Sequence, residues 1–271
     1  MIKCRCSGRA DLISILRAIK IQLKRRLQVN YILNQPKDLP FNRETAYNAL
    51  EMFLNCKVSS ADDVFAHFCS IAQSQMFDYG GQDRFVYVPG SRPDRVLLVA
   101  HADTVWQGSN AEQAVCFEGG VFLSRNGITG TGADDRSGCA ILWMLRSSGH
   151  SLLITDGEER GQRGAQALAR NDELLREINA HSFMVEFDRR GKCDCKYYNI
   201  PVTDQFKEYI AMNTGFIEAG RSSSTDITTL CRSVCGVNLS TGYYNEHTAD
   251  EFLVFDEWFN TLQTAARWLG E

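Results

Sequence analysis

Short apolar runs recur along the chain, and each is followed by polar or acidic residues. Runs of about five residues that are rich in β-branched side chains are typical of strands buried on both faces. Between them, apolar residues recur every three or four positions, which predicts amphipathic helices. We expect strands near residues 84–88, 96–100, 151–155, 183–187 and 234–239, and helices near residues 44–53, 61–73, 137–146, 165–170, 206–212 and 252–268. This alternation predicts an α/β fold, a three-layer αβα sandwich with a mostly parallel mixed sheet.

The first 37 residues differ from the rest of the chain in charge. They hold nine Lys and Arg against Asp11 alone, and apolar residues recur through them at helical spacing, namely Leu12, Ile13, Leu16, Ile19 and Leu23. This pattern predicts a basic amphipathic helical extension over residues 1–37. Three interpretations remain open: the helix packs on the body of the protein, it contacts a membrane surface or a partner, or it is a targeting segment. No apolar run reaches the roughly 18 residues of a transmembrane segment.

The remaining residues, 38–271, have the composition of a single domain. The chain has 271 residues, of which 44% are hydrophobic, so it can bury one sizeable core. Its formal net charge is −4, so nucleic acid is not an expected partner. Ten cysteines occur without a secretory signal, which predicts reduced thiols. We therefore expect a cytoplasmic protein, with targeting or membrane-surface contact of the basic helix left open.

Candidate chemistry begins at the end of the strand predicted over residues 96–100. His101 follows that strand directly, at the position where open α/β sheets place their ligands. Asp103 lies within reach of its imidazole, and a carboxylate in that position fixes the tautomer of a metal-bound histidine. Taken alone, a buried histidine beside a loop aspartate is an equally good interpretation.

Acidic residues follow the next segments in the same way. Asp134 and Asp135 end a glycine-rich loop that leads into a predicted helix, where negative charge is favourable. Glu158 and Glu159 follow the next predicted strand. In a tight turn such neighbours diverge, so that one can bind a metal ion while the other faces a bound water. Each pair also fits a simpler interpretation, a helix N-cap for the aspartates and a solvent-exposed acidic turn for the glutamates.

Two further segments complete the set. Asp188 ends the strand predicted over residues 183–187, and we prefer it to Glu186, which lies two residues earlier on the same face. His247 lies in a polar loop before the last predicted helix. The chain has only five histidines, and surface or core positions are expected for the others, His67, His150 and His181.

Together these side chains form a ligand set for two divalent metal ions. Zinc accepts imidazole and carboxylate ligands, and a catalytic site keeps one position open for water or substrate. The candidate ligands are, in chain order, His101, Asp134, Glu159, Asp188 and His247. Glu158 remains as a spare carboxylate beside the third ligand, in a position suited to a general base. A pair of metal ions with a shared water predicts hydrolysis of an amide or peptide bond.

The order of these residues and the sequences around them resemble the co-catalytic di-zinc exopeptidases, the superfamily of peptidase T, acetylornithine deacetylase and the bacterial leucyl aminopeptidases. The first metal motif of that family is similar to residues 101–105, HADTV. Its loop with a bridging aspartate is similar to residues 132–138, GADDRSG. The motif that carries its base and a ligand is similar to residues 158–165, EERGQRGA. The resemblance covers about residues 80 to 270.

The resemblance implies a role for each ligand. His101 and Asp188 would hold one zinc ion. Glu159 and His247 would hold the second, and Asp134 would bridge the two. The same ligands also accept manganese or cobalt.

The resemblance also implies roles around the metal ions. Asp103 would orient His101. Glu158 would take a proton from the bridging water and pass it to the leaving group. The peptide bond between Asp134 and Asp135 would be cis, which is rare outside proline.

The chain departs from peptidase T in length. Peptidase T and its close relatives insert a lid or dimerisation domain after the fourth metal ligand, but only 58 residues separate Asp188 from His247. We therefore expect one catalytic domain over residues 38–271 without a lid. The segment that contains Asp226 is similar to a site-facing loop of the single-domain aminopeptidases, which places Asp226 near the substrate amine; a helix N-cap is an equally good interpretation. Tyr244, in the segment of His247, is a second candidate for substrate contact.

The expected function is that of an aminopeptidase that uses two zinc ions on a peptide or N-acyl amino acid substrate. Two alternatives remain open. A deacylase or a glutaminyl-cyclase-like acyltransferase would use the same scaffold. A catalytically silent binding domain would belong to a different class, but the retention of all the ligands and of the base argues against it. The sequence leaves the oligomeric state and the side-chain preference open.

Overall fold

The computed structural model describes residues 40–220 and 223–270 of the chain. The basic extension expected over residues 1–37 lies outside the described residues. Within the described part, no helix combines the length and the hydropathy that a bilayer crossing requires.

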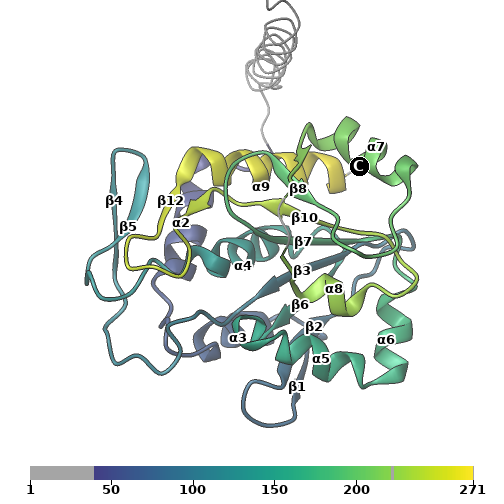
Figure 1. Ribbon diagram of the computed structural model, residues 1–271, viewed down its shortest axis with the longest axis horizontal. Helices are drawn as coiled ribbons and strands as arrows, with labels where there is room; N and C mark the ends of the chain where they lie inside the picture. Colours follow the sequence, from purple (N-terminus) through teal and green to yellow (C-terminus); the bar gives the residue numbers. More distant parts are fainter. Residues whose placement is uncertain (1–39, 221–222, 271) are drawn as a thin grey trace, which may run out of the picture. The chain divides into compact units, whose positions relative to one another are not determined.

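A mixed eight-stranded sheet forms the centre of residues 40–270 (Figure 1). Its four central strands are parallel and follow the buried apolar runs of the sequence: β6 (Ser151–Thr155), β3 (Leu97–His101), β7 (Met184–Arg189) and β10 (Gly236–Ser240). Antiparallel strands β2 (Arg84–Val88) and β1 (Gln75–Asp78) extend one edge. The other edge consists of β8 (Asp194–Lys196), antiparallel to β10, and then β9 (Ile217–Glu218). All the strands that the apolar runs predict are therefore present.

Helices cover both faces of the sheet, and each face has its own hydrophobic core. Leu98 and Ala100 of β3 point into one core, which they share with α2 (Arg43–Leu54), α3 (Asp62–Cys69), α4 (Ala133–Leu145), α7 (Asp204–Thr214) and α9 (Phe255–Gly270). Leu97 and Val99 point into the other core, which they share with α5 (Arg163–Ala169), α6 (Asp172–Ile178) and α8 (Asp226–Leu230). Because side chains alternate across a strand, one apolar run serves both cores. The predicted three-layer αβα sandwich is confirmed.

The apolar pattern does not predict a second, four-stranded sheet, which consists of β11 (Tyr243–Tyr244), β12 (Phe252–Val254), β5 (Val121–Ser124) and β4 (Val115–Glu118). Strands of two to four residues are too short to show a clear alternation. The helix predicted from residue 252 begins instead at Phe255, because the residues before it pair with β5. The helix predicted over residues 61–73 ends at Cys69.

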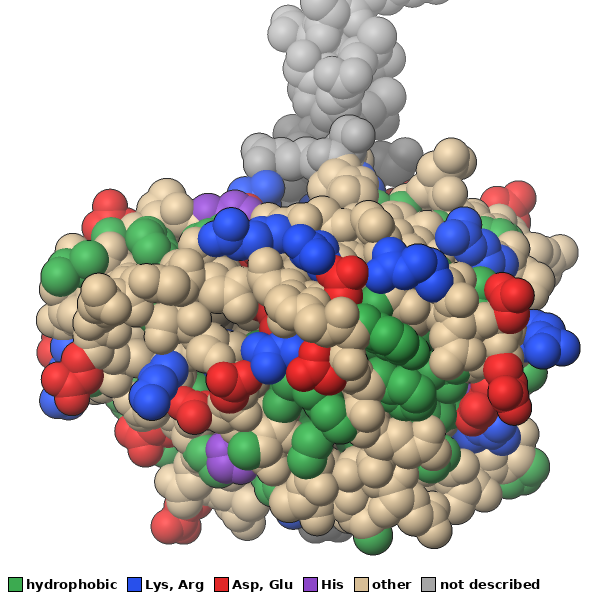
Figure 2. Space-filling model, turned by 90° about the horizontal axis from the view of Figure 1, so that it is seen from below, with side chains coloured by type: hydrophobic (Ala, Val, Ile, Leu, Met, Phe, Trp, Pro, Cys, Tyr) green, Lys and Arg blue, Asp and Glu red, His purple; other side chains and the backbone are tan. Residues whose placement is uncertain are grey.

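The face of the molecule shown in Figure 2 carries charges of both signs. Lys and Arg side chains lie among Asp and Glu side chains, and several hydrophobic side chains gather between them. This mixture of positive and negative side chains agrees with the small formal net charge of the chain, −4.

His150 is a core residue that links Val96, directly before β3, to the end of α9. Its Nδ1 accepts the backbone N–H of Val96 at 3.0 Å, and its Nε2 donates to the carbonyl oxygen of Leu269 at 2.8 Å. Burial lowers the pKa of His150 below its ordinary value. Since the pKa in the folded state lies below the unfolded value of about 6.5, the stabilising contribution is complete above that pH. It is lost as the pH falls through the folded-state pKa, because the folded protein resists taking up the proton.

We expect the thermal unfolding midpoint to fall as the pH is lowered from about 7.5 to about 5, through and below the ordinary histidine pKa of about 6.5. The fall should be smaller in a His150→Gln variant, since glutamine offers a donor and an acceptor but does not titrate in this range. Circular dichroism during heating, at both pH values, measures the difference. Equal falls in the two proteins would contradict this account of His150.

Candidate metal centre

The predicted ligand residues meet at the carboxyl edge of the parallel strands. His101 is the last residue of β3, and Asp188 lies near the end of the neighbouring strand β7. Glu159 lies in the short 3-10 turn after β6, and Asp134 lies at the start of α4. His247 comes from the segment between β11 and β12. Parallel strands end at a common edge of a sheet, so residues far apart in sequence come together there.

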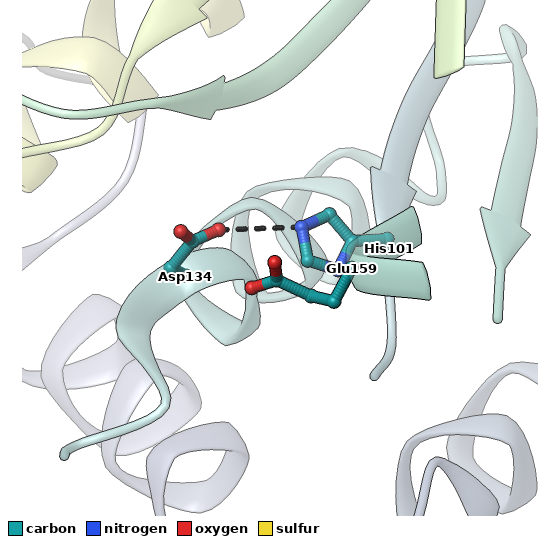
Figure 3. Close-up of side chains that lie close together, drawn as sticks. All are labelled: His101, Asp134 and Glu159. Carbon is teal, nitrogen blue, oxygen red and sulfur yellow. Dashed lines mark hydrogen bonds and ion pairs between the residues drawn. The ribbon is translucent and has the colours of Figure 1, made fainter. Parts of the chain in front are cut away.

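Asp134 lies between two histidines. Its Oδ1 is 3.2 Å from Nε2 of His101, and its Oδ2 is 3.2 Å from Nε2 of His247. The same nitrogen of His101 is 3.5 Å from Oδ1 of Asp188. The same nitrogen of His247 is 2.9 Å from Oε1 of Glu159. Figure 3 shows Asp134 facing the imidazole of His101, with the carboxylate of Glu159 beside them. The structure therefore brings all the candidate ligands together, with Asp134 shared between two groups.

A distant carboxylate fixes the loop that carries Asp134. Glu251 is buried, and it accepts the N–H of Gly132 at 2.7 Å with one oxygen and the N–H of Asp134 at 3.0 Å with the other. Gly132 has a φ of +69°, which a glycine adopts without a steric penalty. The peptide bond between Asp134 and Asp135 is cis, as the family resemblance implies.

Asp103 connects His101 to the turn η1 (Glu158–Arg160). Its Oδ1 lies 3.3 Å from Nδ1 of His101 and accepts the N–H of Glu158 at 3.1 Å. Its Oδ2 accepts the N–H of Glu159 at 3.3 Å. A carboxylate on the distal nitrogen fixes the orientation of a metal-binding imidazole. Nδ1 of His101 also hydrogen-bonds the backbone carbonyl oxygen of Asp103 at 3.2 Å. Asp103 therefore positions His101 with its carboxylate and its backbone, and it positions both glutamates through their N–H groups.

Two hydroxyl groups and one amide hold Asp188. The hydroxyl of Tyr243 donates to its Oδ1 at 3.1 Å, and the hydroxyl of Thr225 donates to its Oδ2 at 2.9 Å. Its backbone N–H donates to the side-chain oxygen of Asn238 at 2.9 Å, and the Nδ2 of Asn238 donates back to its carbonyl oxygen at 2.7 Å. Burial, followed by the charge of Asp134, raises the pKa of Asp188 to about 6. The carboxylate is thus held in one orientation at the end of its strand.

Glu158 lines a cavity of about 140 Å³ together with Asp134, Glu159, Asp188 and His247. Burial is the largest cause that raises the pKa of Glu158 well above its ordinary value. General bases work best when their pKa lies near the operating pH, and they must lie within hydrogen-bond reach of the proton they take. The spare carboxylate therefore shares one cavity with four of the five candidate ligands, whereas His101 is fully buried and does not line it.

The donor groups in and beside this cavity fit divalent cations. His101, Asp134 and Glu159 present ligand atoms that all lie within 4.8 Å of one another, and so do His101, Asp135 and Asp188. Asp135 is an addition to the predicted set. Among the described residues, Asp134, Glu159 and Asp188 form ion pairs with His101 or His247 and with no Lys or Arg. Hydrogen bonds to Asp134 and Glu159 raise the pKa of His247 to about 11, so its imidazole holds a proton beside these carboxylates. Bound metal ions would take the place of that proton.

Solved structures share this fold, although no family model and no curated protein sequence matches the chain. Aminopeptidase PepT from Bacillus cereus is 12% identical with a TM-score of 0.64, over 84% of this chain and 98% of that one. A tripeptidase from Staphylococcus aureus is 13% identical with a TM-score of 0.63 over the same shares, 84% and 98%. An aminopeptidase from the archaeon Desulfurococcus kamchatkensis is 12% identical with a TM-score of 0.59, over 84% and 97%. The chain has the fold of these peptidases. The resemblance indicated by its motifs is confirmed at the level of the fold.

Neither of the two residues predicted to contact substrate, Asp226 and Tyr244, lines this cavity. Asp226 is fully buried as the first residue of α8, where its Oδ2 accepts a threonine hydroxyl from β6, and it does not line the cavity. Thr225 takes the N-cap position, so Asp226 is not the N-cap either. Tyr244 donates its hydroxyl to Glu257 at 2.6 Å, whereas its neighbour Tyr243 lines the cavity. Adjacent strand residues point to opposite faces, which explains why one tyrosine reaches the cavity and the other does not.

Replacement of Glu251 by glutamine should weaken metal binding at the site that contains Asp134. Glutamine keeps one oxygen that can accept a hydrogen bond. Its NH2 group would face the backbone N–H of either Gly132 or Asp134, which now donates to Glu251. Loss of such a supporting contact typically lowers metal affinity about tenfold to a hundredfold. Competition with a coloured zinc chelator measures the change, and Glu118→Gln, at an exposed end of β4, is the matched control. Equal affinities in the two variants would show that Glu251 does not position the site.

Proposed function

We propose that the protein is a metal-dependent hydrolase of peptide bonds, and specifically an aminopeptidase that uses two divalent metal ions. The observation that carries this proposal is the position of Asp134, whose two oxygens face the imidazoles of His101 and His247 at equal distances of 3.2 Å. A single carboxylate shared in this way is suited to bridging two cations.

The contacts support the assignment of ligands that the family resemblance implies. His101 and Asp188 would bind one, Glu159 and His247 the other, and Asp134 both. Zinc fits this set of imidazoles and carboxylates, and manganese or cobalt would also be accepted. When bound, such ions polarise a substrate carbonyl and make water a better nucleophile at neutral pH.

Glu158 would move the proton during hydrolysis. Its carboxylate lines the cavity beside the candidate ligands. It would take a proton from the attacking water and deliver it to the nitrogen of the leaving amine, so that the C–N bond breaks without release of an amide anion. Asp103 would keep this base in place, because it accepts the backbone N–H groups of Glu158 and Glu159.

We further propose that residues 38–271 form the catalytic domain without an inserted lid. The described residues between Asp188 and His247 are used by elements of the two sheets and by helices α7 and α8, which supports this proposal. The cavity would then open to substrate without movement of a second domain.

A peptide panel tests the proposed specificity of the metal-reconstituted protein. An aminopeptidase should release the first residue of a tripeptide and should not act on its N-acetylated form. Preferential cleavage of the acetyl group would identify a deacylase. Cyclisation of peptides that begin with glutamine would identify an acyltransferase. Product analysis by mass spectrometry separates these three outcomes.

A further inference from the structure

Two arginines that follow Asp188 line the same cavity as the candidate metal ligands. Arg189 is the last residue of β7, and Arg190 comes directly after it. Glu246, next to His247, lines the cavity as well. These residues have no part in the proposed hydrolysis, so their presence in the cavity calls for another role.

Arg189 is a buried cation without a bonded partner. It is 9% exposed, and its side chain forms no ion pair or hydrogen bond with a described residue. Its Nε is buried without an acceptor, whereas its two Nη atoms are not fully buried, and the residue lines the cavity. Burial raises the pKa of Asp194 and the charge of Arg189 acts against that rise, but the two side chains form no ion pair. A buried guanidinium without an acceptor is unfavourable. An anionic group bound in the cavity would supply the acceptor that Arg189 lacks among the described residues.

Arg190 is held in place by one acid and keeps donors for a second. Its Nη1 pairs with Oε1 of Glu246, while 44% of its side chain is exposed. A guanidinium has five N–H donors in a rigid fork, so one carboxylate does not exhaust it. The second oxygen of Glu246 is buried without a hydrogen-bond partner, so the ion pair with Arg190 is the contact that orients this carboxylate among the described residues.

The charge of the whole cavity supports an anionic ligand once metal ions are bound. Five carboxylates and two arginines line it, namely Asp134, Glu158, Glu159, Asp188, Glu246, Arg189 and Arg190. Two divalent cations would make this lining net positive. The arginines lie on the side of the cavity formed by the end of β7, beside Asp188.

We propose that Arg189 and Arg190 form a carboxylate-binding subsite, so that the preferred substrates are peptides with a carboxylate close to the scissile bond. This inference rests on the proposed peptidase function. The carboxylate could come from an acidic first residue or from the C terminus of a very short peptide. Both sources offer two oxygens that match the guanidinium fork.

Matched substrates test the subsite in the parent protein. One arm compares glutamyl with glutaminyl aminocoumarin amides, and the other compares alanyl-alanine with alanyl-alaninamide. We expect kcat/KM to favour the carboxylate member of at least one pair by about tenfold to a hundredfold, as for a hydrogen bond to a charged group. The arm that shows the preference identifies the source of the carboxylate. Hydrolysis without preference in either arm overturns the subsite alone, whereas no hydrolysis of any substrate overturns the peptidase function and the subsite with it.

Variants assign the preference to the arginines. Arg190→Gln changes an exposed side chain, so folding should be retained, and the ratio of the two kcat/KM values should fall towards one. Arg189→Lys keeps the positive charge but loses the fork, and the ratio should fall only in part. Arg146→Gln, an exposed position after α4, is the control and should keep the parent ratio. Parent ratios in both the Arg189→Lys and Arg190→Gln proteins would overturn the assignment.

Discussion

Replacement of Glu158 by glutamine is expected to lower kcat/KM by about a hundredfold to ten-thousandfold while both metal ions stay bound. Glutamine is similar in size but cannot take up a proton. Glu158 is not a member of either group of close ligand atoms among the described residues, so its loss should leave the metal site intact.

Steady-state hydrolysis of a tripeptide and metal analysis of the same samples measure both quantities. The control is Glu44→Gln, an exposed position in the first turn of α2, which should behave like the parent. Two bound metal ions together with the parent rate in the Glu158→Gln protein would show that another group is the base.

Replacement of Asp134 by asparagine is expected to remove at least one metal ion and nearly all activity. The amide is neutral and offers only one oxygen, whereas the carboxylate faces His101 and His247 with one oxygen each. Metal ions contribute several kcal/mol to stabilising the transition state, which corresponds to a loss of about a thousandfold or more in rate.

Plasma mass spectrometry of the purified variant gives the metal content per chain. Asp204→Asn, at the exposed start of α7, is the matched control and should keep two ions. Full metal content in the Asp134→Asn protein would contradict the bridging role.

The central fold could be predicted because its signal is local. Each central strand is a continuous apolar run, since both faces of the sheet are covered by helices. The candidate ligands could be placed for a related reason. His101 and Asp188 occur at the ends of such runs, and parallel strands end at one edge.

The features that the sequence does not reveal depend on contacts between distant segments. Glu251 binds the loop of Asp134 although it lies 117 positions further along the chain, and no local sequence pattern predicts that contact. The pairing of β12 with β5 turns the expected start of the last helix into a strand.

The burial and the direction of single side chains also depend on contacts between distant segments, so the sequence does not predict them. Asp226 follows a polar, serine-rich segment in the sequence, yet its side chain is fully buried and accepts a threonine hydroxyl of β6. The choice between Tyr243 and Tyr244 depends on which face of β11 meets the cavity. The sequence alone does not set that face, because the strand is only two residues long.

The most direct test of the central claim is a zinc titration of chelator-treated protein, followed by the rate of hydrolysis of a tripeptide with a free N terminus. The account predicts no hydrolysis before zinc is added, a rise with each addition, and a plateau at two equivalents per chain. A rate that is the same before and after removal of metal would contradict the account.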